Sequence, residues 1–174
     1  MTKQRQTECE SAYNALVANR ITAFIGMPDS LLAPLFTYIS GKPDIEYIPT
    51  THEAVAIGIA AGMTLAGRKC LVAMENSGVR AAFETLTRLS ISHHLFVCML
   101  LSDRGGFGER NWWGVPHSFT SKAVLELLRI VNHPVENAAD FNGALVSAYA
   151  TLAAGQCSVA LVATHIFTER LAQG

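Results

Sequence analysis

The chain has 174 residues, half of them hydrophobic and only 16% charged. This length predicts one domain over residues 1–174, and the apolar surplus predicts buried parallel strands together with a large protein interface. A net charge of −1 is atypical of nucleic-acid-binding proteins. No apolar run is long enough to cross a bilayer, and residues 1–5 carry no secretory signal. The four cysteines lie far apart without metal-site spacing, as buried reduced thiols do, so we expect a cytoplasmic protein.

Hydrophobic periodicity and turn residues predict helices that alternate with strands. In chain order we expect a helix at 8–19, a strand at 21–25, a helix after 30, a strand at 45–48, a helix at 52–65, a strand at 70–74, a helix at 80–89, a strand at 94–101, a loop at 102–119, a helix at 121–128, a strand at 134–137, a helix at 140–154 and a strand at 158–163. Residues 164–174 are expected to form a short tail outside a core of about residues 8–163. The alternation predicts an α/β fold, with a single doubly wound, mostly parallel sheet flanked by helices.

Ligands of doubly wound sheets bind beyond the carboxyl ends of the strands. Four segments of this chain follow predicted strands, at residues 26–30, 49–53, 75–78 and 102–117. We therefore expect the functional site where these segments meet. The chain lacks the Gly-x-Ser-x-Gly of nucleophile elbows and the glycine-rich loops that bind nucleotide phosphates, which disfavours both classes of protein.

Glu53 stands at the start of the most apolar predicted helix. Residues 50–53 fit the Thr-x-x-Glu capping box, in which the glutamate accepts the N–H of the capping threonine. The helix behind it looks buried on every side, however, and a buried carboxylate needs a partner such as a cation or a ligand. A structural and a functional role both stay open on these grounds. Gly58 and Gly62 share one face of the same helix, which would let another backbone approach closely.

Other polar residues near the predicted strand ends also allow two interpretations. Asp29 is either a helix cap or an acid that faces the same cleft, and residues 76–78 form a turn of low specificity. His117 is a candidate for proton transfer or anion contact. The arginines are candidates for holding an anionic substrate or are solvated surface charges; they are Arg80, Arg104 and Arg110. We propose no metal ligand, because the His93-His94 pair has no acidic or cysteine neighbour.

Four motifs in this order resemble those of one family. They are Met27-Pro28-Asp29-Ser30-Leu31-Leu32, the His52-Glu53 entry into an Ala/Gly-rich helix that ends at Gly67-Arg68-Lys69, Asn76-Ser77-Gly78, and Arg104-Gly105 with Gly108-Glu109. The chain resembles the pyrimidine-binding (Pyr) domain of thiamine-diphosphate-dependent 2-oxo acid decarboxylases. It is most similar to the sulfopyruvate and phosphonopyruvate decarboxylases. The resemblance covers residues 8–163.

The resemblance implies roles for individual residues. Glu53 is expected to hydrogen-bond N1′ of the cofactor's aminopyrimidine, and Asp29 to transfer protons during catalysis. Asn76, Ser77 and Gly78 are expected to line the pyrimidine pocket. Substrate contacts are expected from residues near the long loop, namely Arg80, Arg104, Glu109 and His117. Val79-Arg80-Ala81 replaces the Leu-Gly-Asn typical of phosphonopyruvate enzymes, so an aromatic or other 2-oxo acid stays open beside a 3-sulfo or 3-phosphono one.

The resemblance also implies a second chain. Family members bind the diphosphate and Mg²⁺ through a Gly-Asp-Gly segment of another domain, and this sequence contains no Gly-Asp-Gly. We therefore expect the α subunit of a two-chain lyase, with two or more copies of each chain and with Mg²⁺ bound by the diphosphate-domain partner. The alternatives are a thiamine-diphosphate-dependent carboligase subunit and a non-catalytic α/β binding or regulatory module.

Overall fold

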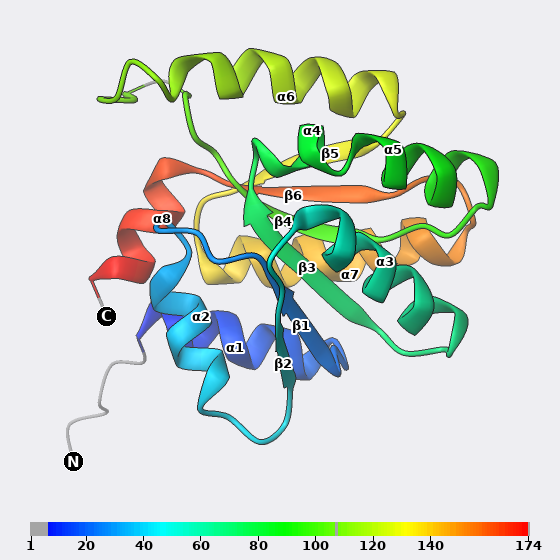
Figure 1. The fold of residues 1–174 in the computed structure, drawn as a ribbon. Helices are drawn as coiled ribbons and strands as arrows, with labels where there is room; N and C mark the ends of the chain where they lie inside the picture. Colours follow the sequence, from blue (N-terminus) through cyan, green and yellow to red (C-terminus); the bar gives the residue numbers. More distant parts are fainter. Residues whose placement is uncertain (1–6, 107, 174) are drawn as a thin grey trace.

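The computed structural model describes residues 7–106 and 108–173 (Figure 1). Its centre is a six-stranded sheet in the order β2-β1-β3-β4-β6-β5, and every neighbouring pair is parallel. The strands are β1 (Ala23–Gly26), β2 (Glu46–Pro49), β3 (Cys70–Glu75), β4 (Cys98–Ser102), β5 (Val131–Val135) and β6 (Val159–Ala163). This order reverses direction beside β1 and confirms the predicted doubly wound α/β fold.

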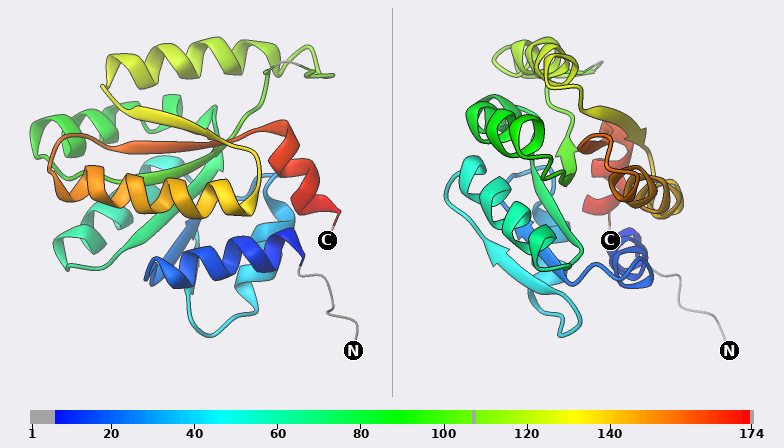
Figure 2. Two further views of the ribbon diagram at one scale, coloured as in Figure 1. Left: turned by 180° about the vertical axis from the view of Figure 1, so that it is seen from behind. Right: turned by 90° about the vertical axis from the view of Figure 1, so that its right-hand side faces the viewer.

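Helices cover both faces of the sheet, as the end-on view in Figure 2 shows. They are α1 (Glu8–Ala18), α2 (Ala33–Ser40), α3 (Glu53–Leu65), α4 (Gly78–Ala81), α5 (Phe83–Leu86), a π-helical stretch Thr87–Ser92, α6 (Val115–Leu127), α7 (Ala138–Ala153) and α8 (His165–Ala172). One layer contains α1, α2, α7 and α8, and the other contains α3 to α6 (Figure 1). The sheet therefore separates two hydrophobic cores.

β3 shows how one short apolar segment serves both cores. Leu71 and Ala73 belong to the core under α1 and α7, whereas Val72 and Met74 belong to the core under α3. Successive side chains of a strand point to opposite faces, and a parallel strand covered on both sides must be apolar throughout. The continuous run at residues 70–74 satisfies that requirement.

Several predicted boundaries are wrong. The helix expected at 80–89 is split, because the backbone of Ala82 (φ −93°, ψ 7°) leaves the helical conformation between α4 and α5. The strand expected at 134–137 begins three residues earlier, at Val131, and pairs with β6. The long loop is shorter than the expected 102–119, since α6 begins at Val115. Pro116 lies in its first turn, where the backbone N–H that proline lacks would have no partner within the helix.

The expected C-terminal tail is also wrong, because residues 165–172 form α8. The Thr164 hydroxyl accepts the N–H of Phe167 and caps the helix. Phe167 is fully buried, and its ring centre lies 5.9 Å from that of Phe141 on α7. Leu171 is buried beside the thiol of Cys9, which donates to its carbonyl. The core therefore extends past residue 163.

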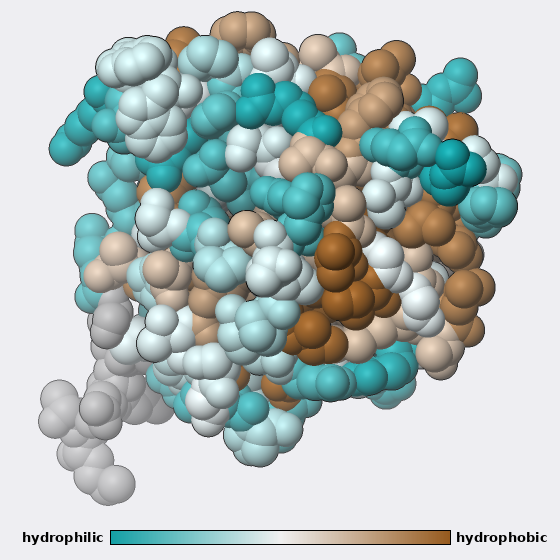
Figure 3. Space-filling view, viewed as in Figure 1, coloured by the Kyte–Doolittle hydropathy of each residue, from teal (hydrophilic) through white to brown (hydrophobic). Residues whose placement is uncertain are grey.

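The helix α3 is less buried than its composition predicts. Ala56, Ile57 and Ala60 face the sheet, whereas Val55 is 51% and Leu65 71% exposed. Apolar surface gathers over this part of the molecule in Figure 3. Within the described residues nothing packs against Gly58 or Gly62, so the close approach expected there stays a prediction. None of the helices that the structure describes combines the length and apolarity needed to span a bilayer.

Replacing Phe167 tests whether α8 belongs to the folded core. We expect Phe167→Ala to lower the free energy of unfolding by about 3–5 kcal/mol, because it leaves a cavity against Phe141. Urea unfolding followed by circular dichroism measures this. The neighbouring Ile166→Ala is the matched control, since Ile166 is 46% exposed. Equal small effects of both substitutions would show that α8 is a detachable tail.

Candidate active site

The predicted site segments meet at one edge of the sheet. All six strands are parallel, so the segments that follow β1, β2, β3 and β4 emerge on the same side. Backbone hydrogen bonds join neighbouring segments there: the Thr50 N–H donates to the Gly26 carbonyl, and the Asn76 N–H donates to the Ser102 carbonyl. The expectation that the polar candidates gather at the carboxyl ends of the strands is thus confirmed by the topology.

Glu53 is the first residue of α3 and is partly buried. The predicted capping box is wrong. The cap is His52, whose Nδ1 accepts the N–H of Ala54 at 3.1 Å, while the Thr50 hydroxyl donates to the Gly26 carbonyl. Among the described residues, no hydrogen bond or ion pair engages the Glu53 carboxylate, which leaves it available to a ligand at the positive end of the helix dipole.

Gly78 gives the Glu53 side chain its place. A Cβ on Gly78 would lie 2.7 Å from Glu53 Cγ and 2.6 Å from Met74 Sδ, closer than real contacts allow. A glycine is therefore required by the approach of Glu53 to the start of α4. This contact joins two of the predicted site residues, although Gly78 makes room for the acid and need not touch a cofactor.

Asp29 is buried, with 9% of its surface exposed. Its carboxylate accepts the backbone N–H groups of Leu31 and Leu32 at 3.3 and 3.2 Å, as a capping residue does. Burial raises the pKa of Asp29, the Ser102 hydroxyl and the two N–H groups lower it, and nearby Glu75 raises it again. The net pKa is above its ordinary value, so Asp29 combines the capping role with that of an acid able to hold a proton.

Asn76 and Ser77 bind the protein itself. The side-chain amide of Asn76 donates to the backbone carbonyl of Arg104 at 2.8 Å, and the backbone carbonyl of Asn76 accepts the hydroxyl of Ser121. Its buried Oδ1 has no partner among the described residues. The Ser77 hydroxyl donates to Glu75 at 2.6 Å. These residues thus fix the turn after β3, and their predicted contact with a pyrimidine stays a prediction.

Glu75 lies in the predicted site segment 75–78, but the sequence analysis gave it no role of its own. It ends β3 and accepts a hydrogen bond from Arg104 Nε at 3.4 Å. Arg104 is itself buried and donates to Ser30 Oγ at 3.1 Å, so the pair ties the end of β3 to the segment after β1. The available signal was its position as the last residue of a buried strand, directly before residues 76–78.

His117 and Arg80 join the same network from α6 and α4. The closest approach is 2.6 Å, between Arg80 Nη2 and His117 Nδ1. The other ring nitrogen of His117, Nε2, lies 3.8 Å from Glu75 Oε1. The structure therefore brings Arg80, Arg104 and His117 together around Glu75, and the fourth predicted substrate residue, Glu109, lies 3.9 Å from Arg104 Nη1.

Glu109 has a different environment, inside the loop before α6. It accepts the N–H groups of Asn111 at 2.9 Å and Gly105 at 3.0 Å. The Asn111 N–H lowers the pKa of Glu109 most, with help from Gly105 and Arg104 against a smaller opposing effect of burial. Its carboxylate is thus occupied in holding the loop together.

The two tryptophans of the same loop have different environments. Trp113 lies over Arg104, whose Cζ is 5.1 Å from the ring centre, while Trp112 is 85% exposed.

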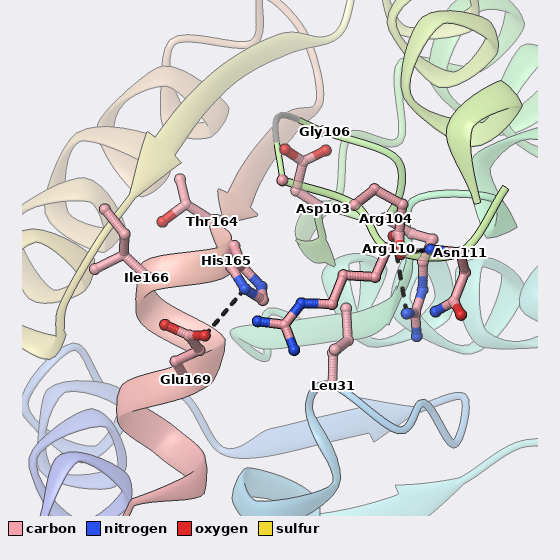
Figure 4. Close-up of a pocket in the computed structure, with 12 residues that line it drawn as sticks. Leu31, Asp103, Arg104, Gly106, Arg110, Asn111, Thr164, His165, Ile166 and Glu169 are labelled. Atoms are coloured by element: carbon pink, nitrogen blue, oxygen red, sulfur yellow. Dashed lines mark hydrogen bonds and ion pairs between the residues drawn. The ribbon is translucent and has the colours of Figure 1, made fainter.

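A pocket of about 590 Å³ opens beside this network, between the loop and α8. Figure 4 shows Arg110 extending across it toward His165, which pairs with Glu169 at 3.0 Å. Leu31 and Arg104 line the pocket, whereas Glu53 is not among its lining residues. In the described part of the chain no three acidic, histidine or cysteine side chains are placed to hold a metal ion.

Gly78 provides a test of the Glu53 contact. We expect Gly78→Ala to lower the free energy of unfolding by about 1–3 kcal/mol, because the new methyl group has no space beside Glu53 and Met74. Gly62→Ala is the matched control: its methyl group meets nothing within 4 Å, so it should raise that free energy by about 0.5–1 kcal/mol. Urea unfolding of the isolated chain compares the two, and a stabilising Gly78→Ala would contradict the contact.

The raised pKa of Asp29 predicts a pH dependence of stability. A folded-state pKa above the unfolded value of 3.8 means that the favourable contribution of this carboxyl is complete below 3.8 and is lost as the pH rises through the folded pKa. Asp29→Asn cannot titrate, so its free energy of unfolding relative to wild type should increase from pH 3.8 toward neutrality. Urea unfolding at several pH values measures the difference. A difference that decreases with pH would contradict the raised pKa.

Comparison with known proteins shows which family the chain resembles. Residues 9–101 match the family described as thiamine pyrophosphate enzyme, N-terminal TPP binding domain. The chain is 33% identical over 118 residues to sulfopyruvate decarboxylase subunit alpha of Methanocaldococcus jannaschii, covering 68% of this chain and 70% of that one. The subunit of the same name from Methanococcus maripaludis is 27% identical over 121 residues, with 70% and 72% covered.

A solved structure supports the same fold. The thiamine diphosphate-dependent 4-hydroxybenzoylformate decarboxylase of Rhodococcus jostii superposes with a TM-score of 0.71 at 20% identity. The match covers 95% of this chain but only 31% of the longer one, so this chain corresponds to one part of that enzyme. The match to residues 9–101 includes β1 to β3 and the start of α3, the elements that position Asp29, Glu53 and Asn76. The chain belongs to the family of N-terminal thiamine pyrophosphate-binding domains of thiamine pyrophosphate enzymes.

Proposed function

We propose that this chain is the Pyr-domain (α) subunit of a two-chain thiamine-diphosphate-dependent decarboxylase that acts on a 2-oxo acid. One observation carries the proposal most directly: the Glu53 carboxylate lies at the first turn of α3, against Gly78, and no described residue engages it. A carboxylate in that position can accept a hydrogen bond from a bound heterocycle. The family match and the relatives named decarboxylase subunit alpha support the same function.

The residues present fit the aminopyrimidine end of the cofactor. When bound, thiamine diphosphate supplies the electron sink that allows carbon dioxide to leave a 2-oxo acid. Glu53 would hold a proton at N1′ of the pyrimidine from its place at the first turn of α3. Gly78 keeps the space in which Glu53 sits, and we propose that the Asn76-Ser77 turn lines the pyrimidine pocket beside it.

Asp29 is proposed as the acid for proton transfer during the reaction. Its raised pKa makes the protonated form more accessible than for an exposed aspartate, which suits a group that transfers protons. The N–H groups of Leu31 and Leu32 hold the carboxyl in place. The same turn thus provides a cap for the chain and a positioned acid for the site.

A partner chain is proposed to complete the site. Two relatives carry the name subunit alpha, which implies a second subunit in those proteins. We infer that a diphosphate-domain chain binds Mg²⁺ and the diphosphate, in a hetero-oligomer with two or more copies of each chain. The exposed apolar side chains of α3, including Val55 and Leu65, support an interface of this kind. The cytoplasmic location stays a prediction.

The proposed substrate is a 3-sulfopyruvate-like or 3-phosphonopyruvate-like anion. Arg80 and His117 adjoin the turn after β3, and Arg110 projects into the neighbouring pocket (Figure 4). Guanidinium groups bind sulfonate and phosphonate oxygens with paired hydrogen bonds. Arg104 contributes less to substrate binding in this proposal, because its donors already engage Glu75 and Ser30.

Replacing Glu53 in the reconstituted enzyme tests the proposal. We expect Glu53→Gln to lower kcat about 10²–10⁴-fold, because the amide cannot accept and hold the proton in the same way. The assay combines the chain with its partner subunit, thiamine diphosphate and Mg²⁺, and measures carbon dioxide release from 3-sulfopyruvate, 3-phosphonopyruvate and an aromatic 2-oxo acid.

The matched control is Glu84→Gln, because Glu84 is an exposed acid on α5 whose one ion-pair partner among the described residues is Arg88. It should turn over at the wild-type rate. Undiminished turnover of Glu53→Gln would contradict the role of that residue. Product analysis with an added aldehyde separates decarboxylation from carboligation, and a lack of cofactor binding in calorimetry would indicate a non-catalytic module.

A further inference from the structure

We propose that Glu75 is a positioning residue of this site, which orients the imidazole of His117 with one carboxylate oxygen and anchors Arg104 with the other. Nothing in the family motifs assigns a role to this acid. The proposal rests on the function proposed above, because it concerns the residues that would face the substrate. The geometric part of it, however, can be tested on this chain alone.

The first step concerns the proton of His117. Arg80 is always charged and has only donors, so its 2.6 Å contact requires that His117 Nδ1 act as the acceptor. The tautomer that satisfies this contact carries its ring proton on Nε2. Arg80 is held for this contact by a second hydrogen bond, from Nη1 to the hydroxyl of Thr120 at 2.9 Å. The geometry on the Arg80 side thus favours one tautomer of His117.

The second step is that this proton faces Glu75. His117 Nε2 lies 3.8 Å from Glu75 Oε1, a separation that allows electrostatic attraction or one bridging water. The same Oε1 accepts the Ser77 hydroxyl at 2.6 Å, which fixes the carboxylate toward the ring. His117 therefore contacts the Arg80 guanidinium through Nδ1 and faces a carboxylate oxygen of Glu75 with Nε2.

The third step separates the two oxygens of Glu75. Oε2 accepts Arg104 Nε at 3.4 Å, while Oε1 serves His117 and Ser77. The side chain of Glu75 is 24% exposed, so the pair with Arg104 is partly screened from water. Glu75→Gln keeps an oxygen that can face His117 but removes the negative charge that faces Arg104. It can thus distinguish the orienting of His117 from the anchoring of Arg104.

The experiment uses the full chain labelled with ¹⁵N-histidine. We expect two-bond ¹H–¹⁵N spectra at pH 7 to show His117 with a protonated Nε2 and an unprotonated Nδ1, and the loss of its signals in His117→Gln assigns them. In Glu75→Leu the preference for this tautomer should weaken, because the ring loses its acceptor. In Glu75→Gln it should persist, because an amide oxygen can occupy the same position. Glu84→Gln is the matched control and should leave the spectrum unchanged.

Kinetics of the reconstituted enzyme provide the second measurement. Loss of a charge-assisted contact predicts that kcat falls about tenfold to a hundredfold in Glu75→Leu. The dissociation constant of thiamine diphosphate should stay within about twofold, since Glu53 is untouched. Glu75→Gln should recover part of kcat through the oxygen that faces His117. A structural defect would instead weaken cofactor binding and turnover together.

The outcomes separate this inference from the proposed function. A wild-type His117 protonated on Nδ1, or a tautomer preference equal in wild type and Glu75→Leu, would overturn the role of Glu75 whatever the enzyme does. Full turnover of Glu53→Gln would overturn the proposed function and leave the spectra of His117 as they are. If Glu75→Leu unfolds, the smaller Glu75→Ala takes its place with the same expectation, because it also removes the acceptor that faces His117.

Discussion

The contact between Glu53 and Gly78 is the constraint on which the rest of the site depends. It joins the first turn of α3 to the first turn of α4, and it leaves no space for a side chain at residue 78. The position of Glu53 is therefore set by backbone that follows β3, not only by its own helix. Two strands that lie apart in the sequence must be placed correctly before the carboxylate can have its orientation.

The parallel sheet makes that placement possible. Because every strand runs the same way, the polar segments converge at one edge, where an acid, two arginines and an imidazole make contact. Desolvation makes an unpaired buried ion costly, so these groups are stable only with partners. Arg104 accordingly binds Glu75 and Ser30, and Asp29 accepts two backbone N–H groups. Glu53 stands apart because the chain provides it with no such partner among the described residues.

The helix α3 has one buried and one exposed apolar face, and this division connects the fold to the proposed assembly. Its inner face supplies Ala56, Ile57 and Ala60 to the core, which fixes the direction in which Glu53 emerges. Its outer face presents Val55 and Leu65 to solvent in the isolated chain. A helix that is apolar all round is normally covered all round. The composition of α3 therefore contains information about an interface as well as about the core.

The sequence by itself determined the fold class, the number of strands and the four segments that form the site, because apolar runs and turn residues are local signals. It also determined the family, through Asp29, Glu53 and the Asn76-Ser77-Gly78 turn in their order. Tertiary structure alone decided two features of the helices. The helix α8 forms because Phe167 packs against Phe141, and Thr50 does not cap α3 because its hydroxyl donates to the Gly26 carbonyl of the neighbouring strand. Tertiary structure also revealed Glu75, whose partners lie 29 and 42 residues away in sequence. Such contacts depend on the order of strands in the sheet, and no local pattern encodes that order.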